Sequence, residues 1–392
     1  MNRLGSLPRA ILALGITSLL MDASSELIHS LMPLVMTSLL GASVGLLGLL
    51  EGLAESTAQL TKFFSGRLSD RLGKRKLLTV AGYGLSALSK PLFPLAPTLS
   101  LIFVARFIDR IGKGIRGAPR DALISDITPQ EMRGAAFGLR QSLDSAGAVI
   151  GPLAAVGLLA LLDNDLRSVM WLATIPAVLA VWVLIKGVDE PQSISPHSHT
   201  ISRGNLLAVH QLSAPLWRII IIGSIFTLAR FSEAFLILRA QNIGMSLGTI
   251  PLVMVVMSLT YALGAYPAGS AADRYSHRTL LILGLCTLIL SDLTLARASN
   301  ISAVMMGAAL WGLHMALTQG LLSKLIADTA PLELRGTAFG VAALIQGCAL
   351  LIASTVAGVL WQFIGPAATF YAGTLFAALA FCGLWLEAYI QK

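Results

Sequence analysis

Stretches of mainly apolar residues recur along the whole chain and are separated by short polar segments. Each is about 20 residues long, enough for a helix to cross the ~30 Å hydrocarbon core of a bilayer. A closed β-barrel, the alternative membrane-spanning fold, needs short strands that alternate apolar and polar residues. The stretches here are continuous and rich in Leu, Ala, Ile and Gly. The pattern therefore predicts an all-α integral membrane protein with about twelve transmembrane helices. They are centred near residues 22, 54, 85, 108, 147, 177, 228, 257, 287, 312, 349 and 377.

The composition agrees with this pattern. Of the 392 residues, 55% are hydrophobic and 12% are charged, whereas soluble proteins carry about 25% charged residues. The formal net charge of +8 does not indicate nucleic-acid binding, because the basic residues lie mainly in short loops such as 67–76. By the positive-inside rule these loops face the cytoplasm. Both termini and the segment 188–214 are therefore expected on the cytoplasmic side.

The chain carries no sequence signature of an enzyme or of a bound cofactor. It has no Walker loop, HExxH or Gly-x-Ser-x-Gly motif, so transport driven by ATP hydrolysis within this chain is not expected. The three cysteines lie in apolar segments without Cys-x-x-Cys spacing, which predicts neither disulfides nor a metal site. The first apolar stretch continues into Asp22 and Glu26, so it is expected to be a retained helix rather than a cleaved signal peptide.

A long-range repeat divides the sequence into two halves. The segment 66–71 (GRLSDR) is echoed 203 residues later at 269–274 (GSAADR), and the segment 126–138 is echoed 202 residues later at 328–340. The dipeptide Ser25-Glu26 also matches Ser232-Glu233. We expect two pseudo-symmetric six-helix halves, 1–187 and 215–392, joined by a cytoplasmic linker at 188–214. Such halves are expected to face each other across a site near the membrane midplane.

Carboxylates inside the first two predicted spans are the first candidate functional groups. An ionisable residue within a span costs at least ~2.5–3.5 kcal/mol, so it needs a partner, a wet cavity or a function. Asp22, Glu26 and His29 follow at spacings of four and three and share one helical face. Glu51 and Glu55 repeat that spacing in the second span. Because carboxylates in a medium of low dielectric constant can exchange protons near neutral pH, these four are predicted to couple transport to protons. The alternative is structural pairing with Lys62 or Lys90.

The fourth predicted span is basic instead. Arg106, Arg110, Lys113 and Arg120 fall on one stripe that Asp109 borders, and two further candidate pairs are Arg140 with Asp144 and Arg230 with Glu233. Guanidinium groups bind carboxylate or phosphate in a bidentate manner. One interpretation is an anionic or zwitterionic substrate, and the other is an ion-pair network between spans 1, 2, 4 and 5. The residues predicted to contact substrate are His29, Arg106, Asp109, Arg110, Arg140, Arg230 and Glu233.

Three of these segments resemble signatures of the major facilitator superfamily. The loop 66–76 matches the superfamily's loop signature, in which glycines allow close helix approach and an Asp–Arg pair forms a cytoplasmic charge latch. Segment 106–114 is similar to the span-4 signature, with Asp109 and Arg110 in place of a Gln–Gly pair. The helix-packing residues Gly147, Gly151 and Pro152 resemble the Gly–Pro signature of the exporters. The resemblance implies a conformational gate at Gly66, Asp70, Arg71, Gly73, Asp273 and Arg274.

The resemblance covers nearly the whole chain and implies a secondary transporter of the bacterial inner membrane. The expected function is proton-coupled efflux of a small organic, anionic or metal-chelating compound by alternating access. Proton-coupled uptake of a small organic anion and uniport are the alternatives. The implied partners are a small-molecule substrate, protons and the lipid bilayer, with no nucleic acid and no cofactor, and the protein is expected to be a monomer. A receptor or structural protein would not need charges buried in both halves.

Overall fold

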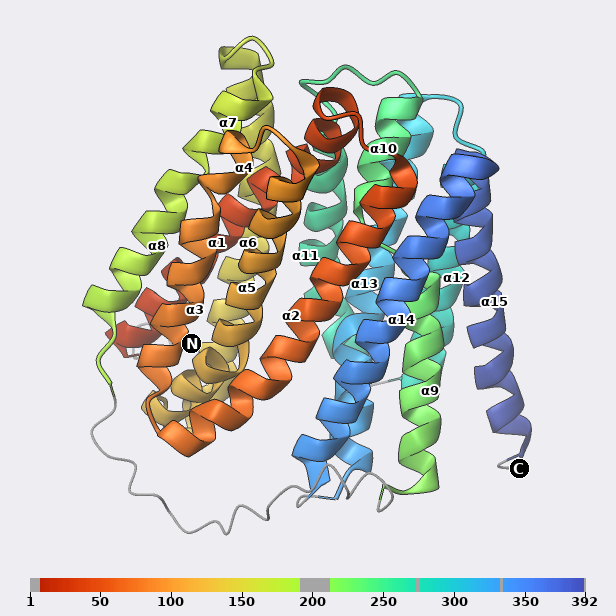
Figure 1. Ribbon diagram of the computed structural model, residues 1–392. Helices are drawn as coiled ribbons and strands as arrows, with labels where there is room; N and C mark the ends of the chain where they lie inside the picture. Colours follow the sequence, from red (N-terminus) through yellow and green to blue (C-terminus); the bar gives the residue numbers. More distant parts are fainter. Residues whose placement is uncertain (1–7, 191–211, 273–274, 332–333, 391–392) are drawn as a thin grey trace. The chain divides into compact units, whose positions relative to one another are not determined.

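The computed structural model describes residues 8–190, 212–272, 275–331 and 334–390, and every regular element in these segments is a helix (Figure 1). In chain order the α-helices are α1 (Arg9–Leu34), α2 (Val44–Leu72), α3 (Arg75–Ser89), α4 (Leu92–Leu95), α5 (Leu99–Ile127), α6 (Arg133–Leu161), α7 (Leu166–Leu172), α8 (Thr174–Gly187), α9 (Ala214–Ala229), α10 (Ala234–Asn242), α11 (Leu252–Ala272), α12 (His277–Ala296), α13 (Ile301–Thr329), α14 (Arg335–Phe363) and α15 (Pro366–Ile390). A π-helical turn, Val35–Leu39, continues α1, and a 3-10 turn, Gln130–Met132, precedes α6.

Nine helical segments of the described chain are long and apolar enough to cross a membrane. Two of these spans, Leu166–Gly187 and Ala214–Asn242, each combine two consecutive helices. Three further helices, α2, α3 and α5, complete the twelve expected from the sequence. These three are not among the nine, because α2 and α5 carry the charged residues singled out above and α3 has only 15 residues. The prediction of an all-α, multi-pass membrane protein is confirmed.

The chain forms two compact units. Unit 1 consists of Met1–Ala42, Thr57–His197 and Leu247–Val255, and unit 2 consists of Ser43–Ser56, Ser198–Ser246 and Val256–Lys392. The helix α2 therefore contributes to both. The predicted halves 1–187 and 215–392 remain a prediction, and the predicted linker 188–214 lies largely outside the described residues.

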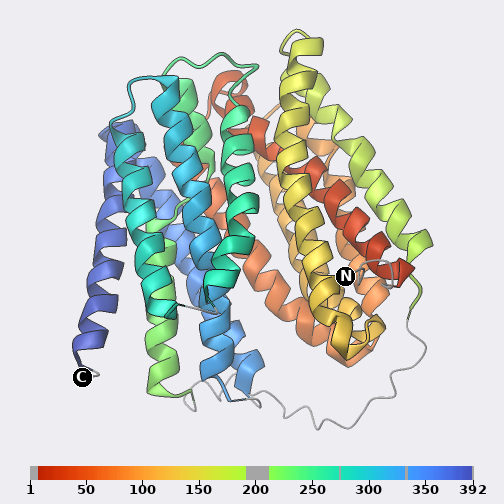
Figure 2. The ribbon, with the colours of Figure 1, turned by 180° about the vertical axis from the view of Figure 1, so that it is seen from behind.

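In unit 1, α1 packs along α6 and α8, and α3 packs against α5 (Figure 2). The buried face of α1 joins α3 and α8 in one apolar cluster that includes Leu14, Met21 and Leu184. Tyr83 of α3 is also part of this cluster and is fully buried. This side of α1 also carries a polar residue, since Ser18 Oγ lies 3.0 Å from the Tyr83 hydroxyl.

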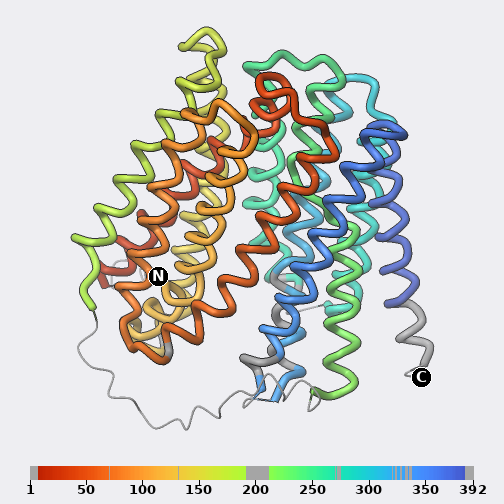
Figure 3. The backbone as a smooth tube through the Cα atoms, in the orientation of Figure 1, coloured from red at the N-terminus to blue at the C-terminus, as the bar shows by residue number. Residues whose placement is uncertain are grey.

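In unit 2, α12 packs against α13 and α15, and α9 packs against α14 and α15 (Figure 3). The span that begins with α9 is interrupted, since α9 ends at Ala229 and α10 begins at Ala234. Hydroxyl groups satisfy backbone donors at the interruption: the Ser232 N–H donates to Ser354 Oγ at 3.1 Å, and the Ala234 N–H donates to Ser232 Oγ at 3.3 Å. These bonds explain how a buried backbone segment can leave the helical ladder.

Candidate functional site

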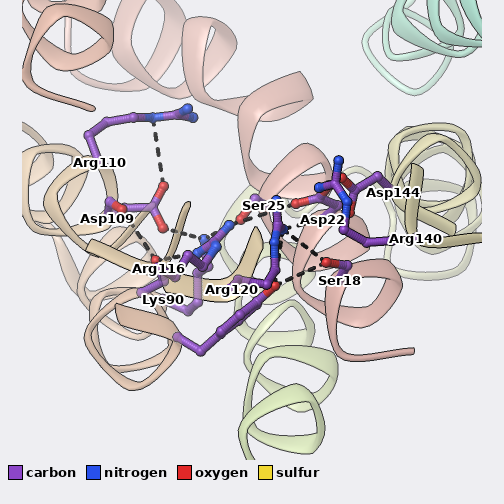
Figure 4. Close-up of polar contacts among 12 residues, drawn as sticks. Ser18, Asp22, Ser25, Lys90, Asp109, Arg110, Arg116, Arg120, Arg140 and Asp144 are labelled. Atoms are coloured by element: carbon purple, nitrogen blue, oxygen red, sulfur yellow. Dashed lines mark hydrogen bonds and ion pairs between the residues drawn. The ribbon is translucent and has the colours of Figure 1, made fainter. Parts of the chain in front are cut away.

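A buried polar network fills the middle of unit 1. One face of α1 carries Ser18, Asp22 and Ser25, and these side chains point toward basic groups from α5 and from the end of α3 (Figure 4). The spacings of four and three residues place all three on the same helical face. Asp22 of the stripe predicted for α1 and Arg120 of the stripe predicted for α5 therefore both belong to this network.

The tightest contact of the network joins Lys90 and Asp109. The Lys90 ammonium lies 2.8 Å from Asp109 Oδ1 and donates to Ser25 Oγ at 2.9 Å. The two charged side chains are 1% and 4% exposed. The second carboxylate oxygen of Asp109 lies 3.8 Å from Arg110 Nε. Breaking such a buried pair leaves an uncompensated charge, so Lys90 and Asp109 are suited to holding α3 and α5 together.

Arg116 forms a looser contact with the carboxylate of Asp22. Its Nη1 donates to Ser86 Oγ at 2.7 Å, and its guanidinium carbon lies 4.6 Å from the centre of the Tyr83 ring. The distance from Nη2 to Asp22 Oδ1 is 3.7 Å, which is too long for a hydrogen bond. Arg116 is therefore positioned by α3 while the Asp22 carboxylate remains free to change partners.

A second group of ion pairs links α5 to α6. Arg120 Nη1 donates to Ser18 Oγ at 3.0 Å and to the Tyr83 hydroxyl at 3.3 Å, and it lies 4.0 Å from Asp144 Oδ1. Asp144 also pairs with Arg140 one turn away on α6, at 2.6 Å. The predicted pair Arg140–Asp144 is therefore present, and Arg120 connects it to α1.

The carboxylates of this network differ in their access to solvent. Asp22 is 28% exposed and Glu26 is 20% exposed, whereas Asp109 is 4% exposed. The Glu26 carboxylate lies 3.3 Å from Nδ1 of His29, which is also on α1. Of these three carboxylates, Asp22 thus combines the largest exposed fraction with a loose ion pair.

Two glycines of α6 allow this helix to approach α1 closely beside these carboxylates. A Cβ added at Gly147 would lie 2.5 Å from Leu19 O and 3.1 Å from Asp22 Cβ. A Cβ added at Gly151 would lie 2.5 Å from Ala23 O and 3.1 Å from Glu26 Cβ. The backbone of α6 therefore touches the backbone of α1 where α1 carries its acidic residues. Pro152, beside Gly151, is buried within the same helix.

Several predicted site residues lie outside this network. Glu51 groups with unit 2, where Ser232 Oγ donates to its Oε2 at 3.3 Å. It is fully buried, so the alternative interpretation of Glu51 as a solvated carboxylate near the end of the second predicted span is wrong. The partly buried Glu55, Arg230 and Glu233 also belong to unit 2. Arg106 and Arg110 are buried on α5, at 1% and 2% exposure. The candidate residues are thus divided between the two units.

The structure describes the predicted gate only in part. Gly66 lies in α2, and Gly73, with a φ of 62°, ends that helix through a 3.0 Å bond from its N–H to Ser69 O. Arg71 is exposed in the last turn of α2. The side chain of Asp70, together with Asp273 and Arg274, lies outside the described residues.

Sequence reasoning passed over Arg116 and treated Lys90 as no more than a structural partner. Arg116 could have been found from spacing, because it stands four residues before Arg120 and continues the stripe of α5. No comparable signal points to Lys90, which follows α3. Within the described part of the chain, no three His, Cys, Asp or Glu side chains gather closely enough to hold a metal ion.

Comparison with known proteins identifies related transporters. The family model of the Major Facilitator Superfamily matches residues 14–239 and 219–389. An uncharacterized MFS-type transporter from Methanocaldococcus jannaschii is 31% identical over 380 residues, covering 95% of this chain and 94% of that protein. The class H tetracycline resistance protein of Pasteurella multocida is 25% identical over 292 residues, 69% of each protein. The crystal structure of a D-xylose–proton symporter matches 96% of this chain and 97% of its own, with a TM-score of 0.73 at 17% identity, which shows a shared fold.

Proposed function

Because this chain belongs to the Major Facilitator Superfamily, we propose that it is a secondary transporter that exports a small organic compound in exchange for protons. We place it in the bacterial inner membrane as a monomer with both termini in the cytoplasm, because its basic loops fit the positive-inside rule. The similarity to a tetracycline resistance protein supports the outward direction. The predicted halves and latches would then support alternating access.

The observation that carries the proposal is the charge balance of the buried network in unit 1. Its ion pairs join five basic and four acidic side chains, a formal excess of one positive charge when all are ionised: Lys90, Arg110, Arg116, Arg120 and Arg140 with Asp22, Asp109, Asp121 and Asp144. Excess charge in a membrane interior is costly. A substrate group with negative charge would reduce that cost, and the guanidinium of Arg116 offers the donors for a carboxylate or phosphate. The network therefore favours a substrate that bears an anionic group.

Exchange also requires a site that holds either a proton or the substrate, but not both. Asp22 fits this role if a cationic group of the substrate, such as an amine or a chelated metal ion, takes the place of the proton. A purely anionic substrate would instead bind Arg116 more readily once Asp22 is protonated, because the carboxylate then no longer competes for the guanidinium. Such a substrate would move together with the proton. We therefore favour a zwitterionic or metal-chelating substrate for efflux, and proton-coupled uptake of a small anion is the second candidate.

Flux into proteoliposomes under an imposed pH gradient tests the proposal. The probes are tetracycline as a zwitterionic chelator, citrate as an anion and tetraphenylphosphonium as a cation. We expect tetracycline to move against the proton gradient in the wild type and to lose its dependence on the gradient in Asp22→Asn. Asp189→Asn, which alters an exposed carboxylate outside the helices, is the matched control. Citrate moving with protons would establish the second candidate instead. If the flux of every probe is independent of the pH gradient, proton coupling is refuted.

A further inference from the structure

Asp292 on α12 is a carboxyl group buried in unit 2 that the network of unit 1 does not involve. It is fully buried, and neither of its carboxyl oxygens has a hydrogen-bond partner within the described part of the chain. Gly373 of α15 lies against it, since a Cβ added to that glycine would be 2.5 Å from Asp292 Oδ2 and 3.1 Å from Phe231 Cε1. The carboxyl group is therefore enclosed between α15 and the interruption that separates α9 from α10.

The surroundings of Asp292 are aromatic and apolar. The ring of Phe231 packs on Trp311 of α13 and on Phe370 of α15, with centroid distances of 5.3 Å and 5.7 Å. Trp311 is fully buried, and its indole N–H also lacks a partner among the described residues. Most buried polar groups in proteins are hydrogen-bonded. Two unpartnered polar groups around one phenylalanine therefore mark this cluster as functional rather than structural.

In the described part of the chain, no charged group of a neighbouring element forms an ion pair or hydrogen bond with Asp292. On α13, Nδ1 of His314 lies 2.8 Å from Gly284 O, two turns before Asp292. On α10, Arg239 donates to the carbonyl groups of Leu295, Ala296 and Ala298. On α15, the titratable side chains in its described part are those of Tyr371 and Cys382, and both are exposed. Arg230 and Glu233, at the interruption itself, are partly buried, and Arg297 follows α12. The Asp292 carboxyl therefore has no counter-charge in contact with it among the described residues.

An ionised carboxylate in such a place would be very unfavourable, because transfer of an isolated charge into an apolar medium costs far more than one hydrogen bond returns. The neutral acid avoids that cost. Phe231 belongs to the one non-helical stretch of its span, residues 230–233, where the chain can change conformation without breaking a helical ladder. Phe231, whose ring lies against Gly373 as the Asp292 carboxyl does, thus belongs to a segment that can act as a hinge.

We propose that Asp292 is a proton-binding site of unit 2, which keeps its proton while Phe231 covers it and exchanges the proton when the segment 230–233 rearranges. In this exchange the O–H bond of the carboxylic acid breaks, the proton passes to water, and the carboxylate remains. The part that this proton plays in transport rests on the proposed function, whereas its presence on Asp292 does not. The site would be separate from Asp22, so that each unit carries a proton of its own.

Infrared difference spectroscopy of the purified protein tests the protonation directly. The difference between wild type and Asp292→Asn at neutral pH should contain the C=O stretch of a protonated carboxyl, shifted in deuterated water. Because Asn resembles the neutral acid, Asp292→Asn should unfold at the same temperature as the wild type. A carboxylate stretch in the difference spectrum, or strong destabilisation by Asn, would overturn the proposal.

Variants of Phe231 test the exchange. Phe231→Ala should uncover Asp292 and convert its signal to that of a carboxylate at neutral pH, whereas Phe231→Leu, which keeps an apolar cover, should retain the protonated form. A proton that stays in place in Phe231→Ala at alkaline pH would show that it is not exchangeable. In proteoliposomes, Asp292→Asn should lower the number of protons moved per tetracycline, and an unchanged ratio would remove its role in transport. Absence of gradient-driven flux in the wild type would refute the proposed function. The infrared result would still show whether Asp292 is protonated.

Discussion

The closest helix contact behind the acidic face of α1 makes Gly151 a sensitive test of the site. Replacement by Ala adds a Cβ that would lie 2.5 Å from Ala23 O and 2.8 Å from Leu27 N, both backbone atoms of α1. Neither atom can rotate away as a side chain could. Because ordinary contacts begin near 3.4 Å, α1 and α6 must separate by about 1 Å to admit the methyl group.

The cost of that separation follows from packing. Inserting a methyl group into a tightly packed interior typically costs about 1–3 kcal/mol. The matched control is Gly157→Ala on the same helix, where an added Cβ meets nothing within 4 Å. There the change should stabilise the helix by roughly 0.5–1 kcal/mol, because Ala loses less backbone entropy than Gly. The free energies of unfolding of the two variants should therefore differ by about 1.5–4 kcal/mol.

Function should suffer as well, since a shift of α1 changes the distance between Asp22 and its partner Arg116 on α5. A displacement of about 1 Å can reduce the rate of a precisely arranged site by up to ~100-fold. Denaturant unfolding in detergent and flux in proteoliposomes measure both effects. Equal stability and equal flux for Gly151→Ala and Gly157→Ala would refute the view that this contact positions the acidic residues.

Three further predictions concern single polar contacts, each checked by denaturant unfolding in detergent. Lys90→Met should lower the free energy of unfolding by about 3–5 kcal/mol, because it leaves the buried Asp109 carboxylate without its ammonium partner. Adding Asp109→Leu should restore most of this loss. A double variant that is no more stable than Lys90→Met would contradict this pairing. Arg239→Met should cost at least ~2 kcal/mol because several carbonyl groups at the end of α12 lose their donor, with Arg239→Lys recovering part of the loss. Ser232→Ala should lower the free energy of unfolding by about 1–3 kcal/mol, because it leaves the Ala234 N–H without an acceptor. Ser25→Ala should lower it less, because Lys90 keeps its ion pair with Asp109. A larger loss for Ser25→Ala than for Ser232→Ala would contradict these contacts.

The fold could be predicted from the sequence because membrane insertion imposes a simple length and composition rule on each helix. The exceptions are informative. The helices α2 and α5 fall short of that rule because they carry many charges, yet flanking spans and repeated loops still locate them. The interruption of the span at residues 230–233 has no proline or glycine to announce it. It depends on hydroxyl groups that satisfy the backbone, one of which belongs to Ser354, distant in sequence.

The candidate site was predictable only within single helices. Residue spacing places Asp22 and Glu26 on one face of α1, and it places Arg110 and Arg120 on α5. Which faces meet depends on helix rotation and packing, which a single sequence does not contain. For this reason Lys90 was considered as a structural partner alone. Asp292 was not predicted, because it is a single acidic residue near the end of an apolar span.

The two units use the repeated sequence in different ways. Ser25 and Ser232 occupy matching positions of the repeat, but Ser25 lies in a continuous helix and accepts a bond from Lys90, whereas Ser232 stabilises a helix break and contacts Glu51. A repeat that served the fold alone would not require such a difference, because glycines and loop charges suffice to set helix packing. In the proposed cycle, unit 1 binds a charged group by exchanging ion-pair partners. Unit 2 encloses an acid that its apolar surroundings favour in the neutral form. In the proposed cycle, the groups that bind the charged substrate lie in unit 1, and the acid of unit 2 stays neutral while Phe231 covers it. This division limits the charge that unit 2 must carry through an apolar medium.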